Sequence, residues 1–378
     1  MRVVHLITSL AADGAQVMLY KLLLGMDRAT FTPLVVSLTD AGVLGESIQK
    51  LGVPVRTLGL RAGLPTPLAL WRLRREVRQF EPDLVQGWMY HGNVAALLAR
   101  VFLTEKVPVL WNIRHSLHNI TLEKRSTAAL IRLGARLSQK PTHIIYNAHV
   151  SAIQHEQWGY RPEKRAVIPN GFDTQRFIPS SHARLQIRAE LALPASTFLI
   201  GLIGRYHPLK DHANFLRAGA SLRQVFPEVH LLCAGRNVDG ENTALMGLVQ
   251  RLGLCTHAHL LGERRDIPSL MAALDVLTVS SSAEAFPNVI GEAMACGVPC
   301  VVTDVGDSAS IVGETGRVVP PNNPKSIAEA WRELIEIGPD ERQRLGAAAR
   351  QRIQEQYSLP AIATRYAGLY TGSVSQPL

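Results

Sequence analysis

Short β-branched, apolar segments alternate with longer helix-compatible segments along the whole chain. In the first half the strand-like segments are residues 3–7, 32–37, 84–86, 107–110 and 143–146, with helix-compatible stretches such as 15–26 and 68–80 between them. The pattern starts again at residues 198–203 and continues at 229–233, 259–261, 275–280 and 301–303. Such alternation predicts parallel sheets covered by helices. The fold class is therefore α/β, with two Rossmann-like, doubly wound domains.

The length and the restart of the pattern set the expected domain organisation. A chain of 378 residues is long enough for two domains, each with its own core. We expect an N-terminal domain at 1–178, a second domain at 179–357, and a C-terminal helix at 358–378 that packs back toward the first domain. The segment 176–196 is rich in Pro, Ser and polar residues and is the expected linker. Two such domains facing a central cleft would line it with the carboxyl ends of both sheets, where ligands bind.

Composition and cysteine content indicate the class of protein and its expected compartment. A hydrophobic content of 47% and a charged content of 19% are typical of a globular protein. We find no run of about 18 uncharged apolar residues that could span a bilayer, and the N-terminus lacks the length and cleavage site of a signal peptide. The four cysteines share no metal-site pattern with histidine. These features predict a reduced, cytoplasmic protein.

Positive charge is concentrated in the first half of the chain. Residues 1–178 contain 22 Lys+Arg and 12 Asp+Glu, a balance of +10, and the remaining residues contain 18 and 19, a balance of −1. The excess gathers at 70–78 and 124–140, where Arg132, Arg136 and Lys140 follow at four-residue spacing beside leucines. Such helices indicate a solvated outer face or, alternatively, a helix peripheral to an anionic membrane, here the inner face of the plasma membrane. Nucleic acid is disfavoured because aromatic residues are not interleaved with the basic ones.

The segment 281–300 carries the clearest chemical signal. It follows a strand-like run, and Pro287 stands where the first residue of a helix is expected. A strand, a loop and a helix N-terminus make an anion site, because unpaired N–H groups and the helix dipole point outward there. Glu284 and Glu292 flank this site. Carboxylates repel phosphate, so we expect them to bind hydroxyl groups of a phosphate-bearing ligand such as a sugar nucleotide.

Arg205 and Lys210 supply the cations that such a ligand needs. Both follow the strand-like run 198–203 and precede a helix, so we expect them to project into the cleft. Two cations would neutralise a diphosphate whose charge grows as its bond to a sugar breaks. The alternative is a surface pair with Asp211. In the first turn, Gly14 lies where the backbone must approach another group closely.

Cofactor signals are missing from the sequence. There is no Gly-x-Gly-x-x-Gly dinucleotide fingerprint. There is also no Asp-x-Asp pair, the usual reason to invoke a metal-bound diphosphate. We therefore expect no cofactor and no metal.

Seven motifs together carry a family resemblance that covers nearly the whole chain. They are Gly14-Ala-Gln16, Asn112-Ile-Arg-His115, Ile168-Pro-Asn-Gly-Phe-Asp173, Gly204-Arg205 with Lys210, Gly262-Glu-Arg-Arg-Asp266, the Glu284 and Glu292 pair, and Ala293-Met-Ala-Cys-Gly-Val-Pro299. With them the chain resembles glycosyltransferase family 4, the retaining "glycosyl transferases group 1", which have the two-domain GT-B fold. The last two motifs are the specific ones.

The resemblance implies roles for single residues. Arg205 and Lys210 would hold the donor diphosphate, Glu292 the ribose hydroxyls, and Glu284 the transferred sugar. The backbone at the helix N-terminus would assist them, at Ala285, Phe286, Pro287, Asn288 and Val289, with Gly14 also on the donor side. His115 matches the family histidine near the reactive carbon, although a structural histidine at a strand end is the alternative. His91 would line the acceptor side, where a structural role is favoured instead.

The implied activity is transfer of a hexose-type sugar from a nucleotide-diphosphate donor to a hydroxyl of a glycan or lipid-linked acceptor, with retained configuration, in polysaccharide or glycoconjugate biosynthesis. No residue is placed as an enzyme nucleophile, so a same-face displacement, in which the departing phosphate takes the acceptor proton, fits better than a covalent intermediate. One alternative is a sugar-nucleotide epimerase or hydrolase on the same fold. Another is a non-catalytic sugar-nucleotide-binding subunit of a polysaccharide assembly.

Overall fold

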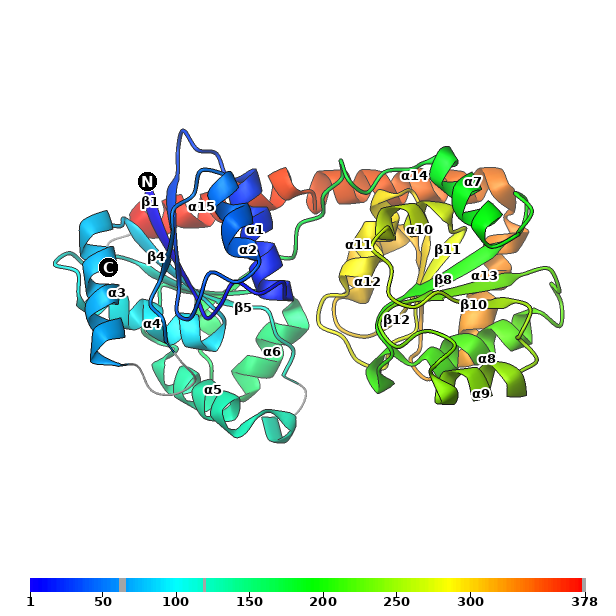
Figure 1. The fold of residues 1–378 in the computed structure, drawn as a ribbon, viewed down its shortest axis with the longest axis horizontal. Coiled ribbons are helices and arrows are strands. Elements are labelled where there is room, and N and C mark those ends of the chain that lie inside the picture. The colour runs from blue at the N-terminus through cyan, green and yellow to red at the C-terminus, as the bar shows by residue number, and fades with distance from the viewer. Residues whose placement is uncertain (61–65, 118–119, 376–378) are drawn as a thin grey trace. The chain divides into compact units, whose positions relative to one another are not determined.

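The computed structural model describes residues 1–60, 66–117 and 120–375 and divides into two compact units. Unit 1 comprises Met1–Gly171 and Leu359–Leu378, and unit 2 comprises Phe172–Ser358. Within each unit, helices cover both faces of a parallel sheet (Figure 1). The boundary expected at 178/179 thus lies inside unit 2, and the last helix of the chain belongs to unit 1.

The sheet of unit 1 has seven strands in the order β3-β2-β1-β4-β5-β6-β7. The strands are β1 (Arg2–Ile7), β2 (Thr32–Ser37), β3 (Val55–Thr57), β4 (Leu84–Trp88), β5 (Val109–Ile113), β6 (His143–Tyr146) and β7 (Arg165–Val167). The helices are α1 (Gly14–Gly25), α2 (Leu44–Lys50), α3 (Pro67–Phe80), α4 (Met89–Val101), α5 (Arg125–Leu137), α6 (His149–Gln157) and α15 (Leu359–Ser375), with 3-10 turns η1 (Ile120–Leu122) and η2 (Pro162–Lys164).

Alternate residues of the strands in unit 1 enter two separate cores. In β1, Val4 and Leu6 belong to a cluster that includes buried residues of α3, α4 and α5. Val3 and Ile7 belong to a second cluster with α1 and α15. Successive side chains of a strand point to opposite faces, so a sheet covered on both faces needs near-continuous apolar strands. This is why the strand segments of this chain are apolar runs without polar alternation.

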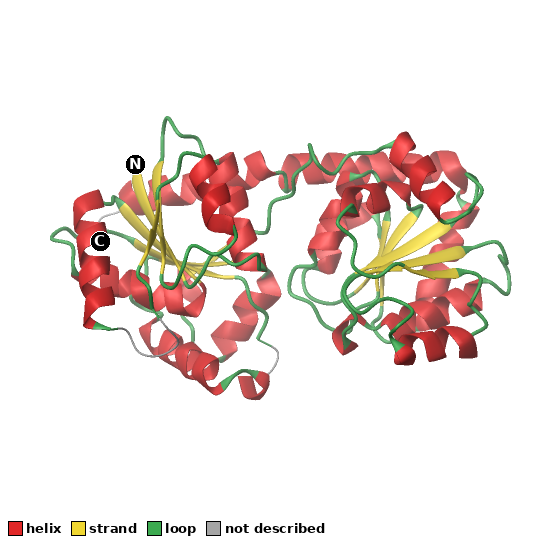
Figure 2. Cartoon of the chain, in the orientation of Figure 1, coloured by secondary structure: helices red, strands yellow, loops and turns green. Residues whose placement is uncertain are grey.

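The sheet of unit 2 has six strands in the order β10-β9-β8-β11-β12-β13. The strands are β8 (Leu199–Ile203), β9 (His230–Ala234), β10 (Ala258–Leu260), β11 (Val276–Val279), β12 (Cys300–Thr303) and β13 (Arg317–Val319). The helices are α7 (Ser181–Glu190), α8 (His212–Leu222), α9 (Thr243–Arg251), α10 (Ile267–Ala273), α11 (Asn288–Ala295), α12 (Ser308–Val312), α13 (Pro324–Glu336) and α14 (Gly338–Gln356), with 3-10 turns η3 (Pro208–Lys210) and η4 (Gly313–Thr315). Figure 2 shows the strands of each unit enclosed by helices.

Every strand-like segment named from the sequence is a strand in the structure. The largest shift is at 107–110, where the strand is β5, Val109–Ile113. Three further strands, β3, β7 and β13, were not predicted. Each has three residues, one of them an arginine, so none forms an apolar run in the sequence.

The prediction of a linker at 176–196 was wrong, because this segment contains helix α7. The Ser180 hydroxyl caps this helix by accepting a hydrogen bond from the Ala183 amide at 3.1 Å. Ala183 and Ile187, four residues apart, are buried on one face. From the same helix Arg188 reaches the Asp275 carboxylate at 2.7 Å. Its polar composition therefore reflects ion pairing within unit 2, and α7 is part of that unit.

Candidate active site

In unit 2, the loops that follow β8 and β11 bring a lysine and a glutamate together. The Lys210 ammonium lies 2.5 Å from a Glu284 carboxylate oxygen, and the same oxygen accepts a hydrogen bond from the Ser281 hydroxyl at 2.7 Å. The two charged side chains are only 27% and 15% exposed. The alternative partner of Lys210, Asp211, instead caps α8 by accepting from the Asn214 amide. In the structure Lys210 therefore pairs with Glu284 and not with Asp211.

The backbone around Lys210 is fixed by the end of β11. The Ser282 amide donates to the Leu209 carbonyl at 2.9 Å. The Ser280 hydroxyl lies 3.0 Å from the carbonyls of both Lys210 and Asp211. These bonds hold turn η3 against the neighbouring loop, so the ion pair does not depend on side-chain contact alone.

Arg205 lies on the same loop but at the surface. The Gly204 amide donates to the Ala234 carbonyl at 2.9 Å, which joins the turn before Arg205 to the end of β9. The Arg205 side chain is exposed, and its guanidinium has no hydrogen bond or ion pair with any residue that the structure describes. The structure therefore brings Lys210 and Glu284 together, whereas Arg205 stays on the turn five residues before Lys210.

The N-terminus of α11 is anchored by an aromatic stack. Pro287 is the N-cap of this helix and Asn288 its first residue, a correction of one position to the sequence prediction. The buried Phe286 ring stacks on Phe172 with centroids 6.1 Å apart. Phe286 is thus a packing residue, and the donor contact predicted for it is one of its backbone.

Residues on both sides of Phe286 are less buried than it is. Ala285 and Val289 are half-buried and Asn288 is exposed. The Ala285 carbonyl accepts from the Asp307 amide at 2.9 Å, which ties the loop to the segment before α12. Glu292 lies one turn into α11 and is half-buried. The Ile290 amide donates to the Pro287 carbonyl at 3.2 Å, and an anion site at the start of α11 stays a prediction.

In unit 1, Gly14 and His91 are both exposed near the carboxyl ends of β1 and β4. Gly14 is the first residue of α1, and no described protein atom lies within 4 Å of the position its Cβ would take. Close protein packing therefore does not explain this glycine. His91 lies in the first turn of α4.

His115 sits in a hydrogen-bonded group after β5. Its Nδ1 lies 3.1 Å from the Tyr90 hydroxyl, and its Nε2 lies 3.4 Å from a Glu123 carboxylate oxygen. The Tyr90 hydroxyl also lies 2.8 Å from Nε2 of His155. The imidazole of His115 is about one third exposed, at 34%. A histidine that is bonded to a buried tyrosine and about one third exposed stays a candidate for ligand contact.

Sequence reasoning missed Tyr90, His155 and Ser281. Tyr90 directly precedes His91, in a segment already marked as a candidate. Ser281 opens the loop that carries Glu284. His155 had no local signal, because it lies on α6 and meets Tyr90 only through the fold.

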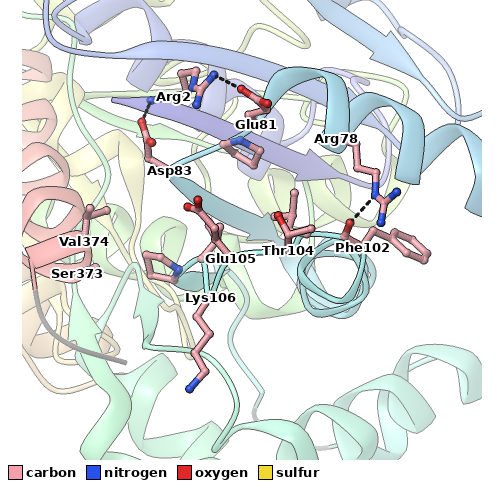
Figure 3. Close-up of a pocket in the computed structure, with 14 residues that line it drawn as sticks. Arg2, Arg78, Glu81, Asp83, Phe102, Thr104, Glu105, Lys106, Ser373 and Val374 are labelled. Carbon is pink, nitrogen blue, oxygen red and sulfur yellow. Dashed lines mark hydrogen bonds and ion pairs between the residues drawn. The ribbon is translucent and has the colours of Figure 1, made fainter.

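A pocket of about 710 Å³ lies elsewhere in unit 1, at the amino ends of the strands. Figure 3 shows Arg2, Glu81 and Asp83 on one side of it and Lys106 on the other. Arg2 pairs there with Glu81 at 3.1 Å. None of the predicted site residues lines this pocket. Ligands of parallel α/β sheets bind at the carboxyl ends of the strands, so we do not assign the site to it.

Among the helices of residues 1–60, 66–117 and 120–375, none combines the length and the apolar character needed to cross a membrane. Across these same residues, no three or more His, Cys, Asp or Glu side chains are grouped as a metal ion would need. The expected independence from metal and cofactor stays a prediction.

Two protein-family models match the two halves of the chain. The model "Glycosyltransferase Family 4" matches residues 12–176, and the model "Glycosyl transferases group 1" matches residues 197–336. The first lies within unit 1 except for its last five residues, and the second lies wholly within unit 2.

Individual proteins agree with the family models. A D-inositol 3-phosphate glycosyltransferase of Corynebacterium urealyticum is 28% identical over 331 residues, which are 80% of this chain and 77% of that protein. A UDP-Gal:alpha-D-GlcNAc-diphosphoundecaprenol alpha-1,3-galactosyltransferase of Escherichia coli is 25% identical over 287 residues, or 73% and 70%. The crystal structure of Anabaena HepE in complex with UDP superposes with a TM-score of 0.83 at 24% identity, covering 98% of this chain and all of that one. This last likeness shows the GT-B fold.

Proposed function

Because the chain belongs to the group 1 glycosyl transferases of glycosyltransferase family 4, we propose that it moves a sugar from a nucleotide-diphosphate sugar to a hydroxyl of a glycan or lipid-linked acceptor. The proposed transfer retains the configuration of the anomeric carbon. The acceptor hydroxyl attacks on the face that the diphosphate leaves, and the departing phosphate takes the acceptor proton. The product would be a glycan or glycoconjugate.

The ion pair between Lys210 and Glu284 is the observation that carries this proposal. It joins the loops after β8 and β11, whose strands are neighbours in the sheet. A diphosphate at the N-terminus of α11 would meet the Lys210 ammonium, while Glu284, already hydrogen-bonded by Ser281, would accept from a sugar hydroxyl. The exposed Arg205 would supply the second positive charge.

The proposed catalysis is electrostatic. Negative charge grows on the diphosphate as the bond to the sugar breaks, and preorganised cations stabilise that charge more than they stabilise the ground state. By analogy with removing a donor from an oxyanion hole, loss of Lys210 costs about 2–4 kcal/mol of transition-state stabilisation. This corresponds to about a 30- to 1,000-fold fall in kcat/KM, since each 1.4 kcal/mol is about tenfold.

For the donor we propose a UDP-hexose. The support is the Escherichia coli relative, whose name specifies UDP-Gal. The experiment begins with a thermal-shift screen of UDP-, GDP- and ADP-sugars, which identifies the base that binds. Only a ligand that binds the folded chain raises its melting temperature. Absence of a shift with every nucleotide sugar at millimolar concentration would contradict the donor class.

Transfer is then measured with the donor so found and an acceptor panel of lipid-linked and free glycans, comparing wild type with Lys210→Ala and Glu284→Ala. The matched control is Lys325→Ala, which removes the same charge from an exposed pair on α13 in the same unit. We expect both site variants to lose transfer while the control keeps it. Near-normal turnover of Lys210→Ala would refute the assignment of roles.

Two results would favour the other activities. Donor consumption without any acceptor would indicate an epimerase or hydrolase. Nucleotide-sugar binding without turnover on any acceptor would indicate a non-catalytic subunit. NMR of the product's anomeric signal distinguishes retention from inversion, and an inverted product would refute the same-face displacement.

We also propose that unit 1 binds an anionic membrane surface at the inner face of the plasma membrane. On α5, Arg132 and Arg136 are exposed and Leu133 is 39% exposed. On α3, Trp71 is 55% exposed with the Arg75 guanidinium 5.0 Å from its ring centre. Exposed apolar groups beside cations suit the boundary between headgroups and acyl chains.

Sedimentation with phosphatidylglycerol vesicles tests this surface. We expect binding at low salt that weakens as salt screens the charges, and weaker binding for Arg132→Glu/Arg136→Glu. Arg332→Glu, at an exposed position on α13 of unit 2, is the control. Absence of binding even at low salt would refute the proposal.

A further inference from the structure

A chain of hydrogen bonds leads from the interior of unit 1 to His115. The carbonyl oxygen of Ser151 lies 2.7 Å from Nδ1 of His155. Nε2 of His155 lies 2.8 Å from the Tyr90 hydroxyl, which lies 3.1 Å from Nδ1 of His115. His155 is fully buried and Tyr90 is 5% exposed, so water does not compete for the contact between them, whereas the contact of Tyr90 with His115 is partly buried. We call these four groups the His115 relay.

The relay has only one consistent arrangement of hydrogens. A carbonyl oxygen only accepts, so Nδ1 of His155 must carry a hydrogen. Burial lowers the pKa of His155 to about 4, so its ring is neutral near pH 7 and its Nε2 accepts. Tyr90 has one hydrogen and must donate it to His155. Its oxygen then accepts from Nδ1–H of His115.

The backbone at the start of α4 holds Tyr90 in place. Met89 has a left-handed φ of 60°, rare for a residue other than glycine. Its sulfur accepts from the Arg114 amide at 3.4 Å. A Cβ on Gly92 would lie 2.4 Å from the Leu6 carbonyl oxygen, so α4 starts pressed against β1. Strained backbone persists where the surrounding structure fixes it and is common at functional sites.

We propose that Tyr90 and His155 are positioning residues that hold the proton of His115 on Nδ1, so that His115 meets the sugar or acceptor hydroxyl through Nε2. This inference rests on the proposed function, because it specifies how a candidate residue of that site acts. Because Nδ1 of His115 is hydrogen-bonded to Tyr90, Nε2 is the nitrogen that would form a hydrogen bond or exchange a proton with a ligand. Glu123, 3.4 Å from Nε2, accepts from this nitrogen when it is protonated.

The direct test is the tautomer of His115, measured by NMR of the full chain with 15N-labelled histidine at alkaline pH, where the ring is neutral. The chain has 13 histidines, and a His115→Gln spectrum identifies the signal. We expect the wild type to carry its hydrogen on Nδ1. In Tyr90→Phe we expect a mixture of tautomers and a fall in kcat of about 10- to 100-fold, by analogy with the partners that orient metal-ligating histidines. Donor affinity, which belongs to unit 2, is expected to stay unchanged.

Tyr146→Phe is the matched control. The Tyr146 ring packs on His155 with centroids 5.6 Å apart, but its buried hydroxyl has no hydrogen-bond partner among the residues that the structure describes. Removing this oxygen deletes the same atom from a neighbouring tyrosine and leaves the relay intact. We expect an unchanged tautomer and unchanged kcat.

A second substitution keeps the relay testable if Tyr90→Phe does not fold. His155→Gln retains an acceptor for the Tyr90 hydroxyl, and we expect it to keep the hydrogen of His115 on Nδ1. A wild-type His115 protonated on Nε2, or a Tyr90→Phe spectrum identical to wild type, would overturn the relay. If the tautomer is as expected but no transfer occurs with any donor, the relay stands and the proposed function fails.

Discussion

Gly235 joins the loops after β8 and β9 in unit 2, and its substitution gives the sharpest test of that arrangement. It follows β9 with a φ of +151°, and a Cβ there would lie 2.2 Å from the Gly204 carbonyl oxygen and 2.9 Å from the Arg205 amide nitrogen. Both are backbone atoms, so no side-chain rotation relieves the contact. In Gly235→Ala, the added methyl must displace the turn that carries Arg205.

The cost follows from two effects of the added methyl. Overpacking of a closely packed site costs about 1–3 kcal/mol. A non-glycine residue in a sparsely populated backbone conformation costs a further 1–3 kcal/mol or so. The free energy of unfolding of unit 2 should therefore fall by about 2–6 kcal/mol. For a unit of this size, 1 kcal/mol corresponds to about 2–4 °C, so we expect the melting temperature to fall by at least about 4 °C.

The functional consequence is expected to be larger than the loss of stability alone suggests. A displacement of about 1 Å at a reacting group can cost about 100-fold in rate. We therefore expect Gly235→Ala to lose about 100-fold in turnover under conditions where it is folded. Circular dichroism gives the melting temperature, and the transfer assay at a temperature well below it gives the rate.

Gly240→Ala is the control for this experiment. Gly240 lies five residues further along the same connection, and no described atom lies within 4 Å of the position of its Cβ. We expect this variant to match wild type. If Gly235→Ala melted and turned over like Gly240→Ala, the loops after β8 and β9 would not hold each other, and the argument for a rigid Arg205 turn would be refuted.

Three further predictions concern stability and reactivity. Asp275→Ala should lower the free energy of urea unfolding by about 3–5 kcal/mol, because it leaves the buried Arg188 guanidinium without its carboxylate; a loss below about 1 kcal/mol would contradict this. Burial lowers the pKa of His5 to about 3, so the unfolded chain takes up a proton below about pH 6.5 that the folded chain refuses. Stability should then fall with decreasing pH by about 1.4 kcal/mol per unit from this group between pH 6.5 and 5. His5→Gln should show a correspondingly shallower slope in urea unfolding at pH 6.5, 6 and 5, and an equal slope would refute the assignment. Cys255 is the exposed cysteine and the other three are buried, so Cys255→Ser should abolish rapid thiol labelling of the native protein; a remaining fast phase would show that a buried thiol is accessible.

Local signals explain what the sequence could predict. The strands of unit 2 are apolar runs bounded by breakers, and the end of α11 follows from Gly297, whose φ is +73°. The site loop was recognisable because Glu284 lies between a strand and a helix start. Such features depend on a few adjacent residues, so they survive without knowledge of the fold.

Features that depend on distant partners could not be predicted in this way. Helix α7 was taken for a linker because its segment is rich in Pro, Ser and polar residues, whereas Arg188 is 1% exposed and bonded to Asp275, 87 residues away. The His115 relay could not be predicted from the sequence for the same reason, because Tyr90 and His155 are 65 residues apart. Polar residues that are satisfied by long-range partners look, in sequence, like surface residues.

Strand order decides which of the predicted residues can act together. In unit 2 the chain runs from β8 outward through β9 and β10, then returns to place β11 on the other side of β8. The chain therefore leaves β8 and β11 toward opposite sides of the sheet, the arrangement at which open α/β sheets bind ligands. Lys210 and Glu284 come from these two loops and meet across 74 residues of sequence.

Unit 1 has the same strand arrangement. Its order places β4 beside β1 on the side opposite β2, so the loops after β1 and β4 diverge in the same way. Gly14 follows β1, and Tyr90 and His91 follow β4. His115 follows β5, the next strand, and is joined to the switch point by Tyr90. In both units, candidate residues follow the two neighbouring strands between which the chain reverses its direction across the sheet. Tyr90 links that point to His115, because its hydroxyl bonds to the histidine that follows the next strand, β5.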